Sequence, residues 1–228
     1  MSAGRLAAVL FDLDGTLIDS APDLLYALDC ILTDLGLPGC DHAALRHHAS
    51  RGAAGILDAG LPVDQEHDRE RLKQRFLDIY ADNLWRRTRP FAGVDELLEH
   101  LGAVDLDLGI VTNKISRFAD PVVEHAGWAG RFKCLITGDR VRNAKPDPEP
   151  VVAACRILGV APSDTLFIGD DRRDILAGQA AGARTAVARW GYIEPGLDSS
   201  AWGADLVLES PDSLIELFSG PYIATQKS

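Results

Sequence analysis

Two carboxylates, a glycine and a hydroxyl group directly follow a short apolar stretch near the start of the chain. Residues 6–11 are almost all apolar, which is typical of a buried parallel strand, and Asp12, Asp14, Gly15 and Thr16 come next. Residues two apart on an extended backbone point to the same side, so Asp12 and Asp14 can face one reacting centre. Carboxylates crowded at the end of a buried strand repel each other, and a divalent cation such as Mg²⁺, which prefers hard oxygen ligands, removes that repulsion. Gly15 permits a sharp exit from the strand that a side chain would obstruct.

Two later apolar stretches, at 106–111 and 165–168, are also expected to be strands that end in polar residues. The residues that follow them are Thr112, Asn113, Gly169, Asp170 and, one helical turn further on, Asp174. Ligands of open α/β sheets bind beyond the carboxyl ends of the strands, so these residues should meet Asp12 and Asp14. Taken singly, each signal has an ordinary structural explanation: a turn for Asp-Gly, a β-branched strand end for Thr112, and helix capping for the later acids.

Lys145 is a candidate for a fixed positive charge. It lies in a loop in which prolines at 146 and 148 restrict the backbone, so its ammonium group can be held in place. Most lysines in such loops are simply solvated, so the functional interpretation depends on the other groups.

The rest of the chain alternates strands and helices. Further strands are expected at 134–137, 184–188 and 206–208. Helices are expected at 94–101, 116–125, 148–158 and 212–218, and another follows Asp171 and ends at 181. This alternation predicts an α/β fold with a doubly wound, parallel, Rossmann-like sheet.

The segment after the first strand has helical periodicity and no strand signal. Four helices are expected, at 22–35, at 41–48, from about 53, and at 64–87, and Ser20 is expected to cap the first of them. We therefore predict a catalytic core made of residues 1–20 and 90–220, an inserted helical domain at 21–89, and a flexible tail at 221–228.

The 228-residue chain is acidic, with 34 Asp and Glu against 23 Lys and Arg, and its net charge is −11. Nucleic-acid-binding proteins carry a basic surface, so a nucleic-acid partner is not expected. The four cysteines are scattered without a Cys-x-x-Cys pair, which favours free thiols over a zinc site. No signal peptide or membrane-spanning stretch is recognisable, so we expect a cytoplasmic protein with no membrane partner, as a monomer or a homodimer.

The order of these signals resembles the four motifs of the haloacid dehalogenase superfamily. They are Asp12-x-Asp14-x-Thr16, Thr112, Lys145 and Gly169-Asp170-x-x-x-Asp174, and the resemblance extends over essentially the whole chain. It implies that the helical insertion is a cap domain that closes over the active site.

The resemblance also implies a mechanism of phosphoryl transfer. Asp12 would attack phosphorus to form an aspartyl-phosphate, and Asp14 would protonate the leaving oxygen and then deprotonate the attacking water. Mg²⁺ would be held by Asp12, the Asp14 carbonyl and Asp170. The remaining roles are phosphoryl or substrate contacts for Thr16, Thr112, Asn113 and Lys145, and a supporting position for Asp174, with the role of Asp171 left open.

The layout of the whole chain resembles that of phosphoglycolate phosphatases. Within them, the segments 111–114, 117–121, 145–150, 169–171, 191–193 and 202–205 resemble a subgroup that hydrolyses N-acetylmuramic acid 6-phosphate. Both compounds carry a carboxylate, and Arg51, in a loop between two expected cap helices, could bind it through bidentate hydrogen bonds. A solvated loop arginine is the alternative. A sugar-phosphate phosphatase or phosphomutase of the same superfamily stays open, as does a non-catalytic binding module, although such modules usually lose one of the two acids of the first motif.

Overall fold

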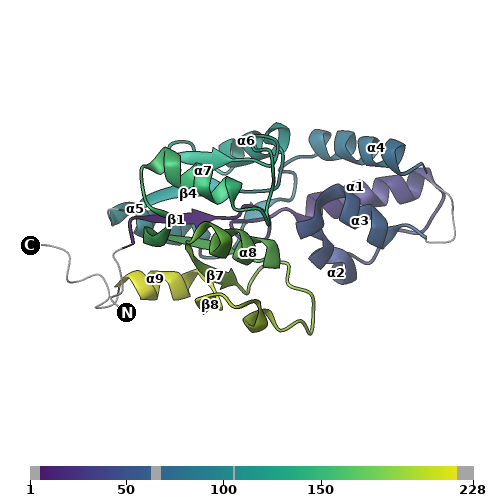
Figure 1. The fold of residues 1–228 in the computed structure, drawn as a ribbon. Helices are drawn as coiled ribbons and strands as arrows, with labels where there is room; N and C mark the ends of the chain where they lie inside the picture. Colours follow the sequence, from purple (N-terminus) through teal and green to yellow (C-terminus); the bar gives the residue numbers. More distant parts are fainter. Residues whose placement is uncertain (1–5, 63–67, 105, 220–228) are drawn as a thin grey trace, which may run out of the picture.

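The central element of the protein is a six-stranded, fully parallel sheet with the order β5-β4-β1-β6-β7-β8 (Figure 1). The strands are β1 (Ala8–Phe11), β4 (Asp107–Val111), β5 (Cys134–Ile136), β6 (Thr165–Gly169), β7 (Arg184–Ala188) and β8 (Leu206–Leu208). The computed structural model describes residues 6–62, 68–104 and 106–219, so the tail predicted at 221–228 lies outside the described residues. The strand order confirms the predicted doubly wound α/β fold.

Helices cover both faces of this sheet. They are α5 (Val94–Ala103), α6 (Ser116–His125), α7 (Glu149–Leu158), α8 (Arg172–Ala181) and α9 (Pro211–Ser219), with short 3₁₀ turns η2 (Pro162–Asp164) and η3 (Ser199–Trp202). Side chains alternate along β1: Val9 and Phe11 pack in one apolar cluster with α5, α6 and α9, and Leu10 packs in another with α7 and α8. The nearly unbroken apolar stretch in the sequence therefore reflects a strand that is buried on both faces.

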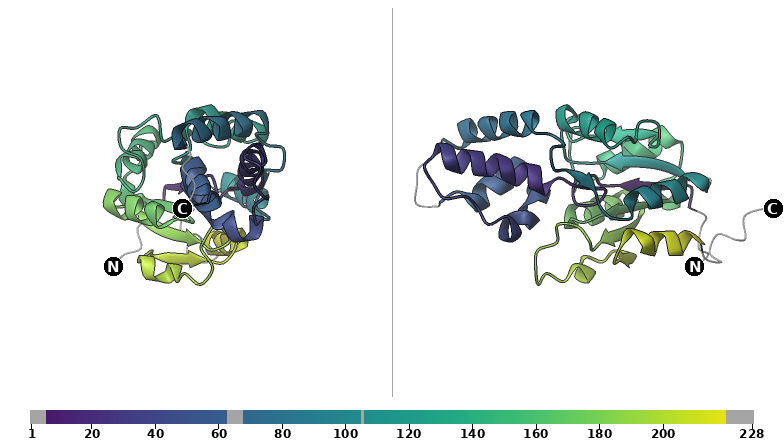
Figure 2. Two further views of the ribbon diagram at one scale, coloured as in Figure 1. Left: turned by 90° about the vertical axis from the view of Figure 1, so that its right-hand side faces the viewer. Right: turned by 180° about the vertical axis from the view of Figure 1, so that it is seen from behind.

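A second group of helices lies beyond the carboxyl ends of the strands, on the right in Figure 1 and facing the viewer in the left panel of Figure 2. It consists of α1 (Ala21–Asp34), α2 (His42–Leu45), the 3₁₀ helix η1 (Arg46–Arg51), α3 (Gly52–Gly60) and α4 (Arg69–Asp82), which we call the cap helices. They enclose an apolar cluster of their own that includes Leu28, Ile56 and Phe76. Among the described residues, no helix combines the length and the apolar character needed to cross a membrane.

The chain crosses twice between the sheet and the cap helices, and the two crossings pair with each other. β2 (Ile18–Asp19) and β3 (Arg89–Pro90) form a two-stranded antiparallel ribbon. The prediction that the insertion at 21–89 contains no strand is therefore wrong at its last residue, because Arg89 begins β3. Two residues are too few to produce a period-2 pattern, and this pairing depends on a partner about 70 residues away in the sequence.

Helix α4 is shorter than the predicted 64–87. Its described part is Arg69–Asp82, and residues 63–67 lie outside the described residues. The helix ends where the Asn83 N–H bonds to the Tyr80 carbonyl and Trp85 adopts a left-handed φ of 67°. The apolar pattern continues past this end because Leu84 and Trp85 pack against the apolar core of the sheet from outside the helix.

The buried carboxylate of Asp23 ties the start of α1 to the returning chain. Its oxygens accept hydrogen bonds from the backbone N–H groups of Arg87 and Thr88 and from the Thr88 hydroxyl, at 2.7–3.0 Å. Asp23→Ala leaves these donors without a partner, so we expect the free energy of unfolding to fall by about 2–4 kcal/mol in urea titration. The matched change of the exposed Asp82 to Ala should alter it by less than about 0.5 kcal/mol. Equal effects of the two substitutions would show that the Asp23 contacts contribute nothing specific.

Candidate active site

The register of the sheet brings the predicted strand ends to one edge. Phe11 on β1 lies opposite Ile110 on β4 and Ile168 on β6, and the Asp12 N–H donates to the Ile168 carbonyl at 2.9 Å. Asp12 is therefore level with Val111 and Gly169, and Thr112 and Asp170 follow one residue further along their strands. This register brings the three strand ends together at one edge of the sheet, as the parallel-sheet prediction requires.

Lys145 is fixed beneath these strand ends by three contacts. Its Nζ lies 2.8 Å from Asp12 Oδ1 and 2.7 Å from Asp174 Oδ1, and it donates to the Val111 carbonyl at 2.9 Å. Burial lowers the pKa of Lys145, but the two carboxylates outweigh it and raise the pKa above its ordinary value. The side chain is only 2 % exposed, so Lys145 is a buried, permanently charged ammonium group beside Asp12.

Asp12, Asp170 and Asp174 form a cluster in which one oxygen of each carboxylate lies within 4.8 Å of the others. Burial raises the pKa of Asp170 well above its ordinary value, and the charges of Asp12 and Asp174 raise it further. Burial likewise raises the pKa of Asp174 to about 7, against the lowering effect of Lys145. The three carboxylates offer hard oxygen ligands, and the single buried lysine neutralises only one of their charges, so the residues fit a divalent cation such as Mg²⁺. The cluster includes Asp174, for which the sequence predicted only a supporting position.

Close packing around Asp170 explains the glycines of the two motifs. A Cβ on Gly15, which has a φ of +86°, would lie 2.2 Å from Asp170 Oδ2, and one on Gly169 would lie 2.2 Å from Asp174 Oδ2. These distances confirm that a side chain at position 15 would obstruct the exit from β1. The Thr16 hydroxyl donates to Asp170 Oδ1 at 2.9 Å and is fully buried, so Thr16 holds this acid and does not line the cavity described below.

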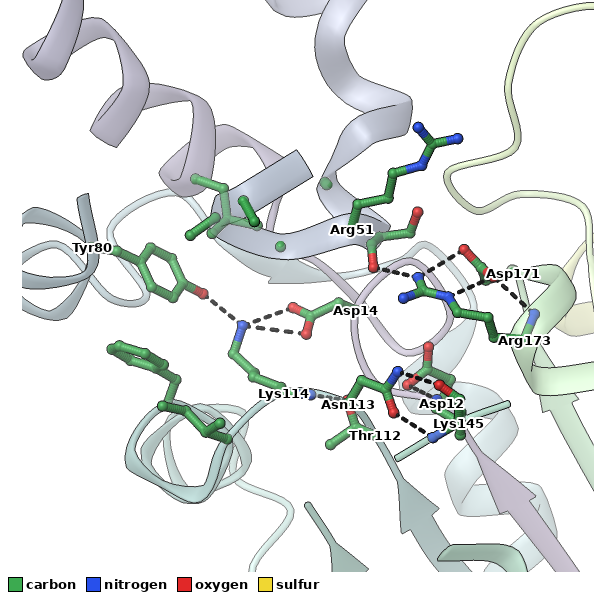
Figure 3. A pocket seen from close by; sticks show the side chains of 18 of the residues that line it. Asp12, Asp14, Arg51, Tyr80, Thr112, Asn113, Lys114, Lys145, Asp171 and Arg173 are labelled. Atoms are coloured by element: carbon green, nitrogen blue, oxygen red, sulfur yellow. Dashed lines mark hydrogen bonds and ion pairs between the residues drawn. The ribbon is translucent and has the colours of Figure 1, made fainter. Parts of the chain in front are cut away.

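The carboxylate of Asp14 lies apart from this cluster and is held by Lys114 (Figure 3). Lys114 Nζ lies 2.9 Å from Asp14 Oδ1 and 2.9 Å from the hydroxyl of Tyr80 on α4, so it connects Asp14 to a cap helix. The Ser20 hydroxyl donates to Asp14 at 2.5 Å, and it makes no capping bond although Ser20 occupies the predicted N-cap position of α1. Lys114 was not among the predicted site residues, because a lysine after a strand end has no pattern that marks its partner.

Thr112 and Asn113 follow β4 as predicted and line the same site. The Asn113 side chain bonds to the backbone of Lys145 in both directions: its Nδ2 donates to the Lys145 carbonyl at 3.0 Å, and its Oδ1 accepts from the Lys145 N–H at 2.9 Å. The Thr112 hydroxyl accepts from the Lys114 N–H at 3.1 Å. The side chain of Asn113 therefore positions the loop that carries Lys145.

Asp171 has two roles that the sequence left open. It caps α8 by accepting from the Arg173 N–H, while Asp174 reciprocally accepts from the Asp171 N–H at 3.0 Å. Its carboxylate also binds the Arg173 side chain through Nε and Nη2, both at 2.9 Å. Arg173 Nη2 also donates a hydrogen bond to the carbonyl of Ser50 in η1 at 2.6 Å, so the Asp171–Arg173 pair joins the core to the cap helices.

Arg51, the predicted carboxylate-binding residue, is exposed, and Figure 3 shows its side chain extending away from Asp12.

A cavity of about 490 Å³ lies between the strand ends and the cap helices. Its polar floor includes Asp12, Asp14, Thr112 and Lys145, and Arg51, Lys73, Lys114 and Arg173 add positive charge around it. Its apolar wall is formed by Leu24, Ala49, Leu77, Ile115 and Phe118. A strongly acidic chain thus concentrates basic side chains where an anionic ligand would bind.

Comparison with known proteins agrees with this geometry. Residues 9–188 match the family model described as haloacid dehalogenase-like hydrolase. The chain is 43% identical over 219 residues to the N-acetylmuramic acid 6-phosphate phosphatase of Pseudomonas aeruginosa, covering 95% of this chain and 96% of that protein. It is 39% identical over 214 residues to the phosphoglycolate phosphatase of Xanthomonas campestris, covering 94% and 97%.

The fold is shared with a solved structure from Haemophilus somnus 129PT, described as a predicted phosphoglycolate phosphatase. The TM-score is 0.83 at 26% identity, covering 94% of this chain and 98% of the other. The match of the family model, the two curated relatives and the fold all agree with the four motifs around Asp12. The chain belongs to the haloacid dehalogenase-like hydrolase family.

Proposed function

We propose that this protein is a Mg²⁺-dependent phosphatase that hydrolyses N-acetylmuramic acid 6-phosphate through an aspartyl-phosphate intermediate. The observation that carries the chemistry is the position of Asp12: its carboxylate lies at the floor of the cavity, beside a buried lysine and two further acids. Phosphatases of this family generally use Mg²⁺. Asp12, Asp170 and the Asp14 carbonyl would hold the ion, with Asp174 adjacent, and the ion would neutralise negative charge on the phosphoryl group.

The residues of the chain divide the reaction into two displacements. In the first, an Asp12 oxygen bonds to phosphorus while the bond from phosphorus to the leaving oxygen breaks, and Asp14 gives that oxygen a proton. In the second, Asp14 takes a proton from water, whose oxygen bonds to phosphorus while the bond to Asp12 breaks, and inorganic phosphate is released. Lys145 and Thr112 stabilise charge on the phosphoryl oxygens, and the Asn113 backbone N–H donates to them.

The size and lining of the cavity favour the amino sugar over phosphoglycolate. A volume of about 490 Å³ falls in the range of sites for drug-sized ligands. Leu77 and Phe118 on its apolar wall can contact a sugar ring, its acetyl methyl group and its lactyl methyl group. Phosphoglycolate has no apolar group beyond one methylene, so it leaves this wall uncovered. The relative with 43% identity that is named for the amino-sugar phosphate supports the same choice.

The test compares kcat/KM for N-acetylmuramic acid 6-phosphate and 2-phosphoglycolate, with inorganic phosphate release measured in the presence of Mg²⁺. We expect the amino sugar to be preferred by at least about 100-fold, which corresponds to about 2.7 kcal/mol of differential transition-state stabilisation. A preference for phosphoglycolate would contradict the substrate assignment and leave the phosphatase chemistry intact. Conversion to an isomeric sugar phosphate without phosphate release would identify a mutase and contradict both.

A further inference from the structure

Arg173, on a helix of the core, lies at the boundary between two cavities. It lies in the first turn of α8 and is 33% exposed, and it lines both the 490 Å³ cavity and a neighbouring cavity of about 610 Å³. Both cavities are lined by Ser50, Arg51, Asp171 and Arg173, so they meet beside the Arg173 contact with Ser50. A substrate group that extends from the phosphoryl site towards the second cavity would come close to this guanidinium.

The guanidinium is held in place before any substrate arrives. Asp171 binds Nε and Nη2 as a two-pronged pair, and the Ser50 carbonyl accepts a further bond from Nη2. Nη1 makes no hydrogen bond to any residue within 6–62, 68–104 or 106–219. Figure 3 shows the guanidinium beside Asp171, and Arg173 lines the same cavity as Asp12 and Asp14. Because Nε and Nη2 already hold the guanidinium in place, it loses little conformational entropy when Nη1 binds a carboxylate.

The other cations around the cavity are less suited to this task. Lys145 and Lys114 are already paired with Asp12 and Asp14. Lys73 on α4 is half-buried at the cavity, but its Nζ lies 3.7 Å from Glu70 Oε1. Arg51 is exposed and extends away from Asp12. Arg173 is therefore the guanidinium that is both fixed and directed to the cavity.

We propose that Arg173, oriented by Asp171, binds the carboxylate of the substrate and so determines the preference for phosphate esters that carry an acid group. This inference rests on the proposed function and names the substrate class of the same site. It gives Asp171 a positioning role, because its carboxylate fixes the guanidinium in the required direction. The sequence prediction assigned the substrate carboxylate to Arg51 instead, and the experiment below distinguishes the two arginines.

The experiment uses two substrates that differ only in the acid: N-acetylmuramic acid 6-phosphate and N-acetylglucosamine 6-phosphate, which lacks the lactyl ether. Arg173→Gln should lower kcat/KM for the first by about 10- to 100-fold, the loss expected for a charge-assisted hydrogen bond, mainly through KM. For the second, kcat/KM should change by less than about threefold. Arg173→Lys keeps the charge without the fork, so it should recover part of the loss.

Arg156→Gln is the control. It removes one positive charge from an exposed position on α7, and Arg156 lines neither cavity, so both substrates should be turned over as by the wild type. An equal loss on both substrates in Arg173→Gln would assign the residue a purely structural role and overturn the proposal. A selective loss in Arg51→Gln, with Arg173→Gln unaffected, would overturn it in favour of Arg51.

The role of Arg173 can be tested even if the proposed substrate is wrong. If the wild type does not hydrolyse N-acetylmuramic acid 6-phosphate, the amino-sugar assignment fails, and the same variants are measured with 2-phosphoglycolate and ethyl phosphate. A selective loss on 2-phosphoglycolate in Arg173→Gln would then support Arg173 as the carboxylate-binding residue, and an equal or absent loss would reject it.

Discussion

Asp12→Asn is expected to reduce kcat by at least about 10,000-fold for every phosphate ester that the wild type hydrolyses. The amide has nearly the same shape as the carboxylate, but it cannot act as the nucleophile, so the route through the covalent intermediate is closed. The fold should persist, because Lys145 keeps its contact with Asp174 at 2.7 Å and the crowded acids lose one negative charge. Steady-state assays with p-nitrophenyl phosphate and with the amino-sugar phosphate measure the effect.

The control for Asp12→Asn is its thermal unfolding temperature compared with that of the wild type. We expect no decrease, since removing one member of a repelling cluster does not create a cavity or an unpaired lysine. Residual activity within about tenfold of the wild type in a folded Asp12→Asn protein would contradict Asp12 as the nucleophile.

Asp14→Asn is expected to have the second largest effect, with kcat for a sugar phosphate falling by about 100- to 10,000-fold. Two proton transfers are lost: the one to the leaving oxygen and the one from the attacking water. An aryl phosphate has a leaving group that departs without a proton, so only the second step is impaired with p-nitrophenyl phosphate. Rapid mixing should therefore show a burst of p-nitrophenol, up to one equivalent of enzyme, followed by slow turnover.

Lys114→Met separates the role of Asp14 from that of its neighbours. This variant removes the ammonium group that connects Asp14 to Tyr80 and keeps the Asp14 carboxylate. A burst in Asp14→Asn but not in Lys114→Met would assign the proton transfers to Asp14 itself. If Asp14→Asn hydrolysed sugar phosphates at near wild-type rates, Asp14 would not be the general acid and base.

The sheet and the strand-end residues could be predicted because the signals are local. An apolar stretch that turns polar within one residue marks a strand end at Asp12, Thr112 and Asp170, and the parallel topology then brings the ends together. The glycine after Asp14 was predicted for the same reason, since its requirement is a property of the turn. These inferences need no knowledge of distant contacts, only the alternation of elements.

The long-range side-chain contacts around the site could not be predicted in this way. Lys114 and Asp14 are 100 residues apart, and Arg173 and Ser50 are 123 residues apart, so no periodicity relates the partners. The hydroxyl of Thr16 was expected at the substrate but bonds to Asp170, 154 residues away. Side-chain direction at such positions depends on the packed tertiary structure, which sequence spacing alone does not specify.

The most direct test of the central claim is to identify the residue that carries the phosphoryl group during turnover. Asp14→Asn mixed with p-nitrophenyl phosphate and Mg²⁺, quenched in acid and digested, should contain one phosphoryl group per enzyme on the peptide that includes Asp12, located by mass spectrometry. The same treatment of Asp12→Asn should yield none. A phosphoryl group on another residue, or rapid phosphate release by an active enzyme that never becomes phosphorylated, would contradict the account.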